Sequence, residues 1–283
     1  MKTIGVVGAG TMGAGIAQVA ALSGFEVVMN DISAELLQQG MDRIAARLHE
    51  GAAKGKLSEA EANAALVRIT TETSFEGFSG CELVIEAAIE HLGVKTEIFR
   101  KLESYCSPDT ILASNTSSLS ITSIASKLAR PDRVAGMHFF NPVHIMQLVE
   151  VVRGHQTSEE VIAAAVDCVR KLGKAPVVVK DTPGFIVNRV ARPFYGEALR
   201  LLGEGVASVE EIDRIVKLEG GFKMGPFELM DLIGIDVNLA VTRSMYEQTF
   251  GEPRYRPHVI QQNMVEAGLL GRKTKRGFYD HSK

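Results

Sequence analysis

The stretch TIGVVGAGTMGAGIAQVAALSGFEVVMND (residues 3–31) decides the fold at the start of the chain. An apolar run is followed at once by Gly8, Gly10 and Gly13, then by a helical pattern and a second apolar run. In this GxGxxG context the first glycine permits a tight turn, the second lets backbone approach a diphosphate, and the third lets helix and strand pack closely. The stretch predicts the first βαβ unit of a doubly wound, Rossmann-like α/β sheet.

A carboxylate, Asp31, follows the second apolar run, 18 residues after Gly13. There it can hydrogen-bond the adenosine ribose hydroxyls of a dinucleotide, and it repels the 2′-phosphate of NADP. No arginine stands beside it in the sequence, so NAD is favoured over NADP as the cofactor. The helix N-terminus would receive the diphosphate, and the contacts expected there come from Gly8, Ala9, Gly10, Thr11, Met12 and Gly13.

The composition is that of an ordinary globular protein, with 283 residues, 46% of them hydrophobic, and a net charge of −3. No lysine- or arginine-rich run is present, so nucleic acid is not an expected partner. No apolar run reaches the roughly 18 residues of a transmembrane helix, so no membrane partner is expected. Three scattered cysteines without CxxC spacing predict free thiols in a reducing cytoplasm and no metal site.

About fifty residues separate Asp31 from the next clear strand, at residues 82–87. Ser58 to Glu61 form a capping box that would begin a helix in the second half of this segment. The first half has apolar side chains at helical spacing, at Leu37, Met41, Ile44 and Leu48. The segment therefore predicts a helical hairpin that is inserted into the sheet.

Basic side chains form a second stripe on the first helix of this hairpin, at Arg43, Arg47 and Lys54. A stripe of this kind is usually a solvated helix face. It can also bind a polyanionic substrate handle, such as a phosphorylated nucleotide. The residues alone leave both interpretations open.

Polar side chains follow two of the predicted strands. Glu90 and Lys95 come after residues 82–87, and the run SNTSS (residues 114–118) comes after a strand at 110–113. Ligands of doubly wound sheets bind outside these carboxyl ends. Glu90 and Lys95 either contact the nicotinamide or its ribose, or form a surface ion pair. The small polar run either caps the next helix or binds a substrate carbonyl.

The run HFFNPVHIMQLVEVV (residues 138–152) places Glu150 on the same strand face as the apolar residues Met146, Leu148 and Val152. A buried carboxylate needs a partner, because leaving it unpaired costs several kcal/mol. His138 is the nearest candidate, and the turn at Asn141-Pro142 would let the two strands fold back on each other. The pair is either structural or a catalytic dyad.

The pattern changes after residues 180–185, where Pro183 and Gly184 interrupt it. Residues 185–283 show helical periodicity and no convincing strand, and Asn188 falls in the first turn of a long helix. We therefore expect a dinucleotide-binding domain of residues 1–184 and an all-helical domain of residues 185–283. The helical domain is strongly apolar, which predicts a homodimer through it.

Five motifs, in this order, resemble those of the 3-hydroxyacyl-CoA dehydrogenases, and most closely the short bacterial 3-hydroxybutyryl-CoA dehydrogenases. They are GAGTMGAGIAQVAA, SNTSSLSIT, HFFNPVHIMQLVEVV, KDTPGFIVNR and GLLGRKTKRGFYD. The resemblance covers essentially the whole chain. It implies an oxidoreductase that reversibly oxidises (S)-3-hydroxybutyryl-CoA, or another short 3-hydroxyacyl-CoA, with NAD, as in fatty-acid and butyrate metabolism.

The resemblance also implies roles for single residues. His138 matches the catalytic base and Glu150 its paired carboxylate, while Ser117 matches the serine near the substrate oxygen and Asn188 the asparagine of the interdomain cleft. Beyond the glycine-rich turn, the positions that match NAD contacts are Asp31, Glu90, Lys95, Ser117, Asn141 and Lys273. The positions that match contacts to the CoA substrate are Arg47, Lys54 and Ser117, although some relatives carry serine where Arg47 stands.

The residues can support this chemistry. Oxidation of a secondary alcohol needs a base for the hydroxyl proton, and His138 held by Glu150 is suited to that task. Ser117 and Asn188 can donate hydrogen bonds to the reacting oxygen.

Two other interpretations are a dehydrogenase of a free hydroxy acid such as gulonate, and a structural protein like the lens crystallin that resembles this family. The intact set of four residues favours the enzyme.

Overall fold

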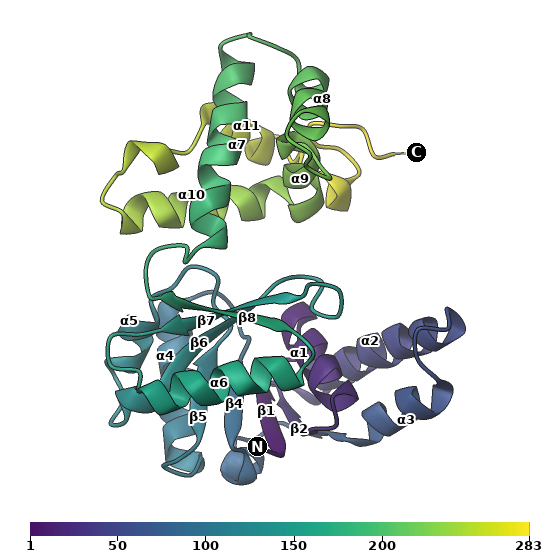
Figure 1. Cartoon of the computed structure of the whole chain (residues 1–283), viewed down its shortest axis with the longest axis vertical. Coiled ribbons are helices and arrows are strands. Elements are labelled where there is room, and N and C mark those ends of the chain that lie inside the picture. The colour runs from purple at the N-terminus through teal and green to yellow at the C-terminus, as the bar shows by residue number, and fades with distance from the viewer. Residues whose placement is uncertain (283) are drawn as a thin grey trace. The chain divides into compact units, whose positions relative to one another are not determined.

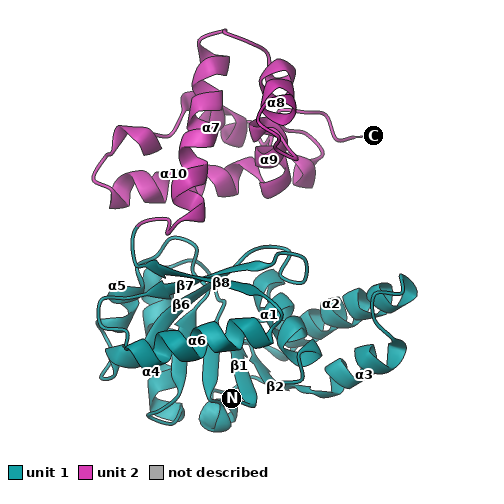
Figure 2. Ribbon diagram, in the orientation of Figure 1, with its two compact units in different colours: residues 1–182 teal, residues 183–283 magenta. Residues whose placement is uncertain are grey.

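The computed structural model of the chain describes residues 1–282 and separates into two compact units (Figure 2). Unit 1 is Met1–Thr182 and unit 2 is Pro183–Lys283. The sequence placed this boundary two residues later, after Gly184. Unit 1 contains the sheet and unit 2 is helical, so the predicted fold class is confirmed.

Unit 1 is built on one eight-stranded sheet in the order β3-β2-β1-β4-β5-β6-β7-β8. All neighbouring strands are parallel except β6 and β7, which are antiparallel. The strands are β1 (Thr3–Val7), β2 (Glu26–Asn30), β3 (Ile69–Glu72), β4 (Leu83–Glu86), β5 (Ile111–Ser114), β6 (Val134–Phe139), β7 (Leu148–Arg153) and β8 (Ala175–Lys180). The two edge strands, β3 and β8, were not foreseen from the sequence.

Helices pack on the sheet, and two of them extend away from it as a hairpin (Figure 1). The hairpin is α2 (Ala34–Ala53) and α3 (Glu59–Val67), which confirms the predicted insertion. Its second helix begins with the expected capping box between Ser58 and Glu61. The helices on the sheet are α1 (Thr11–Leu22), α4 (Leu92–Tyr105), α5 (Ile121–Ala125) and α6 (Glu159–Lys171), with short 3₁₀ turns at η1 (Glu76–Gly80) and η2 (Pro131–Arg133).

The glycine-rich turn is packed so closely that two of its glycines cannot be replaced without movement. Gly8 has φ +99°, in the left-handed region, and a Cβ there would lie 2.8 Å from the Ala87 carbonyl oxygen. A Cβ on Gly13 would lie only 1.7 Å from the Gly8 carbonyl oxygen. The turn thus brings the start of α1 onto β1, as the motif requires.

Unit 2 packs its helices around a separate apolar core that includes Tyr195, Leu199, Phe227, Met230 and Ile235. Its helices are α7 (Val187–Gly203), α8 (Val209–Leu218), α9 (Pro226–Ile233), α10 (Ile235–Gln248) and α11 (Val259–Glu266), with 3₁₀ turns η3 (Pro253–Tyr255) and η4 (Arg272–Thr274). Within residues 183–282 only isolated β-bridges form, and no strand. None of the helices in residues 1–282 has the length and apolar character needed to cross a membrane.

Two buried aspartates attach the end of the chain to this core. Asp231 accepts hydrogen bonds from the backbone N–H groups of Phe278 and Tyr279 and from the His281 ring. Asp213 accepts from the Tyr279 hydroxyl and from two backbone N–H groups at the start of α9. The charge of each carboxylate is therefore satisfied by several donors, which offsets its burial.

Replacing Gly13 by alanine should destabilise unit 1, because the new Cβ would collide with the Gly8 carbonyl and force α1 away from β1. We expect Gly13→Ala to lower the free energy of unfolding by about 1–3 kcal/mol, the usual cost of overpacking. Urea denaturation followed by circular dichroism measures it. Gly10→Ala is the matched control, since a Cβ at Gly10 meets nothing within 4 Å. Equal stability of the two variants would contradict this account of the turn.

Candidate active site

A cavity of about 660 Å³ opens at the carboxyl ends of β1, β2 and β4 in unit 1. Five of its lining residues come from the glycine-rich turn and the start of α1: Gly8, Ala9, Gly10, Thr11 and Met12. Asp31 lines it from the end of β2, and residues 87–89 line it from the loop after β4. This volume and position are typical of a cofactor site in a doubly wound sheet.

The residues around this cavity fit a dinucleotide diphosphate. The space beside Gly10 is open, because an added Cβ would meet no atom within 4 Å, and no side chain caps the first turn of α1. The N–H groups and positive end of that helix are thus available to an anion. Asp31 is held at the rim, where its carboxylate accepts from Ala9 N at 2.6 Å and Ile32 N at 2.7 Å. Gly8 to Gly13 and Asp31 are the residues that would hold NAD.

One basic residue of the predicted stripe belongs to this cavity. Arg43, on α2, lines it together with Asp31, and its Nη2 donates to the Ala9 carbonyl oxygen at 2.7 Å. The sequence grouped Arg43 with Arg47 and Lys54 as one stripe, and found no arginine near Asp31. Helix α2 instead brings Arg43 from 12 residues away to the cofactor cavity, so the stripe is divided between two surfaces.

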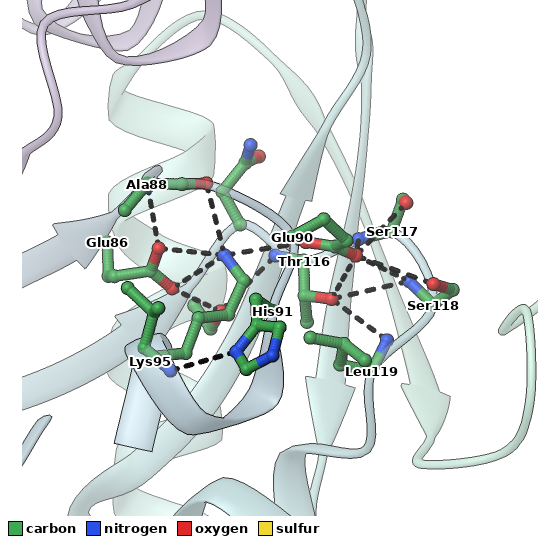
Figure 3. A network of polar contacts seen from close by, with 12 residues as sticks. Glu86, Ala88, Glu90, His91, Lys95, Thr116, Ser117, Ser118 and Leu119 are labelled. Carbon is green, nitrogen blue, oxygen red and sulfur yellow. Dashed lines mark hydrogen bonds and ion pairs between the residues drawn. The ribbon is translucent and has the colours of Figure 1, made fainter. Parts of the chain in front are cut away.

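A buried ion pair lies at the carboxyl end of β4 (Figure 3). Lys95 Nζ is 2.7 Å from Glu86 Oε1, and the two side chains are 1% and 0% exposed. Ser114 Oγ also donates to Glu86, at 2.7 Å. The expected ion pair between Glu90 and Lys95 also forms, at 3.4 Å, but Lys95 is buried and only Glu90 reaches the surface. Glu86 was missed by the sequence analysis, although a carboxylate within an apolar strand was the same signal that identified Glu150.

Glu90 continues this network toward the loop after β5 (Figure 3). It lies 3.4 Å from Lys95 Nζ and accepts from Thr116 Oγ1 at 2.5 Å and from Ser117 N at 2.9 Å. Burial by itself would raise the pKa of Glu90, but Lys95 and these donors together hold it below its ordinary value. The Ser117 hydroxyl also contacts Glu90, at 3.3 Å.

The run at residues 114–118 does not cap the following helix, because Ser120 is the residue whose side chain caps α5. Its members instead bind the two carboxylates: Ser114 binds Glu86, while Thr116, Ser117 and Ser118 bind Glu90. The network therefore fixes the loop that carries Ser117 relative to the loop after β4.

His138 and Glu150 face each other across the antiparallel pair β6–β7, where they occupy directly opposite positions. His138 Nδ1 lies 2.8 Å from Glu150 Oε2, and the two residues are 6% and 1% exposed. The two strands fold back on each other as the sequence predicted, although β7 begins only at Leu148. Because Glu150 accepts the Nδ1 proton, the remaining ring nitrogen, Nε2, is the one that can accept a proton from a substrate.

The loop between β6 and β7 lies near the hairpin helix α2. His144, in this loop, has a pKa lowered first by burial and next by the positive charge of Arg47. Asn141 is exposed in the same loop, and Arg47 is half-buried. Lys54, at the end of α2, is exposed and forms an ion pair with Glu50. Arg47 and the loop that follows His138 thus share one electrostatic environment.

Two of the predicted site residues lie in unit 2. Asn188 is in the first turn of α7, as expected, and its Oδ1 accepts a hydrogen bond from Arg192 Nη2 at 3.5 Å. Lys273 lies in η4 and its Nζ is 2.6 Å from a carboxylate oxygen of Asp236.

Among residues 1–282, no three His, Cys, Asp or Glu side chains gather as a metal site would require.

The chain matches the two domain models of one family over nearly its whole length. Residues 3–182 match the NAD-binding domain of 3-hydroxyacyl-CoA dehydrogenase, and residues 184–281 match the C-terminal domain. Both domains of the family are thus present, in the family's order.

Individual relatives agree with this assignment. The chain is 49% identical to 3-hydroxyadipyl-CoA dehydrogenase of Escherichia coli, over 99% of this chain and 59% of that longer protein. It is 46% identical to 3-hydroxybutyryl-CoA dehydrogenase of Bradyrhizobium diazoefficiens, over 99% of this chain and 96% of the other. It superposes on the crystal structure of (S)-3-hydroxybutyryl-CoA dehydrogenase from Ralstonia eutropha with a TM-score of 0.96, at 47% identity and covering 100% of both chains. The chain therefore belongs to the 3-hydroxyacyl-CoA dehydrogenase family and is an NAD-linked oxidoreductase of that family.

Proposed function

We propose that the chain oxidises (S)-3-hydroxybutyryl-CoA, or a similarly short 3-hydroxyacyl-CoA, reversibly to the 3-oxoacyl-CoA, with the His138–Glu150 dyad as the acid–base group. The observation that carries the proposal is the buried contact of 2.8 Å between the ring and the carboxylate. The similarity to two 3-hydroxybutyryl-CoA dehydrogenases over nearly their full length supports the choice of substrate.

The proposed reaction moves a hydride and a proton. NAD, when bound, accepts the hydride from carbon 3 of the substrate at the nicotinamide ring. His138 Nε2 takes the proton of the 3-hydroxyl group, and Glu150 stabilises the imidazolium that forms. In the reverse direction the same nitrogen returns the proton to the oxygen. Ser117 and Asn188 are proposed to donate hydrogen bonds to that oxygen as negative charge develops on it.

The network of Glu86, Lys95 and Glu90 supports the role proposed for Ser117. Glu90 accepts from the backbone N–H of Ser117 at 2.9 Å, so the serine is held in place before a substrate arrives. The single O–H of Ser117 contacts Glu90 at 3.3 Å, and it must turn from Glu90 to the substrate oxygen to donate there. Lys95 is fully buried against Glu86. We propose that it contributes to NAD binding mainly by holding Glu90 in place, and not by contacting NAD extensively itself. Asn141 and Lys273 remain proposed NAD contacts.

A dicarboxylic substrate is the second candidate, because one relative with 49% identity is a 3-hydroxyadipyl-CoA dehydrogenase. NADH oxidation with acetoacetyl-CoA and with 3-oxoadipyl-CoA, at equal concentrations, separates the two. A clear preference for acetoacetyl-CoA is expected. A free hydroxy acid such as gulonate should not be oxidised, because it lacks the CoA handle.

A homodimer through residues 185–283 is part of the proposal. Several large apolar side chains of unit 2 are exposed, among them Val190, Leu218, Phe222 and Phe250, and an interface between two copies would remove such side chains from water. Sedimentation velocity at micromolar concentration should give the mass of two chains, and a single monomeric species would contradict it.

The basic residues that remain in the stripe, Arg47 and Lys54, are proposed to bind the phosphates of CoA. Replacing Lys54 by alanine should raise KM for acetoacetyl-CoA about tenfold, the value of one hydrogen bond to a charged group, and should change kcat little, because the contact is far from the reacting carbon. Steady-state NADH oxidation gives both constants. Lys127→Ala, at an exposed lysine on another surface of unit 1, is the control. An unchanged KM would remove Lys54 from the site.

Replacing His138 by glutamine should lower kcat by about 10²- to 10⁴-fold, because the proton of the hydroxyl would lose its acceptor. Glu150→Gln should also lower kcat, since a neutral amide cannot stabilise the imidazolium. NADH binding, measured by fluorescence titration, should be retained in both variants. Substantial acetoacetyl-CoA reduction by His138→Gln would show that another group is the base.

A further inference from the structure

Arg192, on α7, is a buried positive charge for which unit 2 provides no negative partner. It is 5% exposed, and its Nη1 donates to the Asn238 carbonyl oxygen at 2.9 Å and to Thr242 Oγ1 at 3.2 Å. The guanidinium carbon lies 4.8 Å from the centroid of the Tyr195 ring. Within residues 1–282 no carboxylate forms an ion pair with Arg192, and its Nε has no hydrogen-bond acceptor.

The fold by itself gives little reason for this charge. Burial lowers the pKa of Arg192 to about 10, so the group is still protonated at neutral pH. An uncompensated buried charge is unfavourable, and an apolar side chain of similar size usually fills such a position with equal or greater stability. A costly buried ion in a family of enzymes is therefore a candidate for a role in the reaction.

Arg192 contacts one residue of the proposed site. Asn188 lies one helical turn earlier on the same face of α7, and Arg192 Nη2 donates to Asn188 Oδ1 at 3.5 Å. A guanidinium group has donors and no acceptor, so the amide oxygen must face it. The amide nitrogen of Asn188 is consequently directed away from Arg192.

We propose that Arg192 is a positioning residue for the dehydrogenase reaction, and that it acts through Asn188. It fixes the amide of Asn188 with the nitrogen outward, and its charge polarises the amide so that the amide N–H groups become better donors. The inference rests on the proposed function, in which Asn188 donates to the reacting oxygen of the substrate. The contact of 3.5 Å is long, and hydrogen bonds of this kind commonly shorten when the substrate complex forms.

The neighbours of Arg192 support this role, because they fix the guanidinium independently of Asn188. Asn238 and Thr242 both belong to α10 and hold Nη1, while Tyr195 lies against the plane of the charge. Nη2 therefore has a defined position from which to orient the amide. A lysine at this site would retain the charge but could not reach the same set of acceptors with a planar fork.

The test compares kcat and KM for acetoacetyl-CoA in a set of variants. Arg192→Met should lower kcat about 10- to 100-fold, the usual effect of losing an outer residue that orients a reacting group, while KM changes much less. Arg192→Lys should recover part of kcat. The matched control is Arg200→Met on the same helix, because Arg200 pairs with Glu197 and contacts neither Asn188 nor Arg192; it should retain wild-type activity.

The decisive comparison is the double variant Asn188→Ala/Arg192→Met. If Arg192 acts through Asn188, the double variant should have the kcat of Asn188→Ala, since the second change removes nothing further. Losses that multiply would overturn the proposal, and so would full activity of Arg192→Met. Wild-type protein without activity toward acetoacetyl-CoA would instead contradict the proposed function itself.

Thermal unfolding of each variant separates folding from positioning. If Arg192→Met does not fold, Thr242→Val removes one of the acceptors that hold Nη1 and leaves the charge in place. Thr242→Val should lower kcat in the wild-type background and have no effect on kcat in the Asn188→Ala background. An equal loss in both backgrounds would overturn the proposal.

Discussion

The contact between His138 Nδ1 and Glu150 Oε2 constrains the whole end of the sheet in unit 1. The two residues are opposite each other only because β7 runs antiparallel to β6 in this register, and a shift by one residue would turn Glu150 to the other face. Since the ring and the carboxylate are both buried, either one without the other would be a costly isolated polar group. Lys174 holds the connecting loop by donating to the carbonyl oxygens of Val143 and Met146. The strand register thus fixes the geometry of the proposed His138–Glu150 dyad.

A second set of charges, of which Lys95 and Glu86 are buried and Glu90 is partly exposed, performs a similar task at β4 and β5. Lys95 lies between Glu86 and Glu90, and the hydroxyl and N–H groups of the loop after β5 satisfy the remaining carboxylate lone pairs. A buried lysine and two carboxylates carry a net negative charge, so every additional donor lowers its cost. These donors come from Ser114 to Ser118, and the loop that carries Ser117 is therefore fixed by the electrostatic requirements of Glu86 and Glu90. Two polar networks, one at β4 and β5 and one at β6 and β7, thus position the loops at these strands.

The sequence was informative wherever a local pattern has one physical explanation. The glycine-rich turn, the capping box at Ser58 and the pairing of His138 with Glu150 all follow from short-range rules. Strands β1, β2 and β6 were predicted to within about a residue, whereas β7 begins at Leu148, after the expected strand residue Met146. Edge strand β3 (ITTE) was missed because it lacks an apolar run, whereas β8 (APVVVK) contains such a run that was not recognised as a strand. Arg43 was assigned to the wrong surface, since only the direction of α2 brings it to Asp31. Contacts between residues far apart in the chain, such as Glu86 with Ser114, depend on strand order, and no spacing in the sequence encodes it.

Arg43 also changes the argument for the cofactor. From the sequence, the preference for NAD rested on Asp31 alone, whose charge repels a 2′-phosphate. Arg43 lines the same cavity as Asp31, so the positive charge of the one offsets the negative charge of the other. The net charge of the cavity therefore cannot distinguish NAD from NADP. The distinction must come from geometry: Asp31 is held at the rim by Ala9 N and Ile32 N, whereas Arg43 is engaged with the Ala9 carbonyl oxygen. A carboxylate fixed in place can accept from two ribose hydroxyls, and an arginine already bound to backbone has less freedom to turn toward a phosphate. The preference for NAD that the sequence predicts therefore depends on which of the two charges is oriented for a ligand, and the backbone of the glycine-rich turn contacts both side chains.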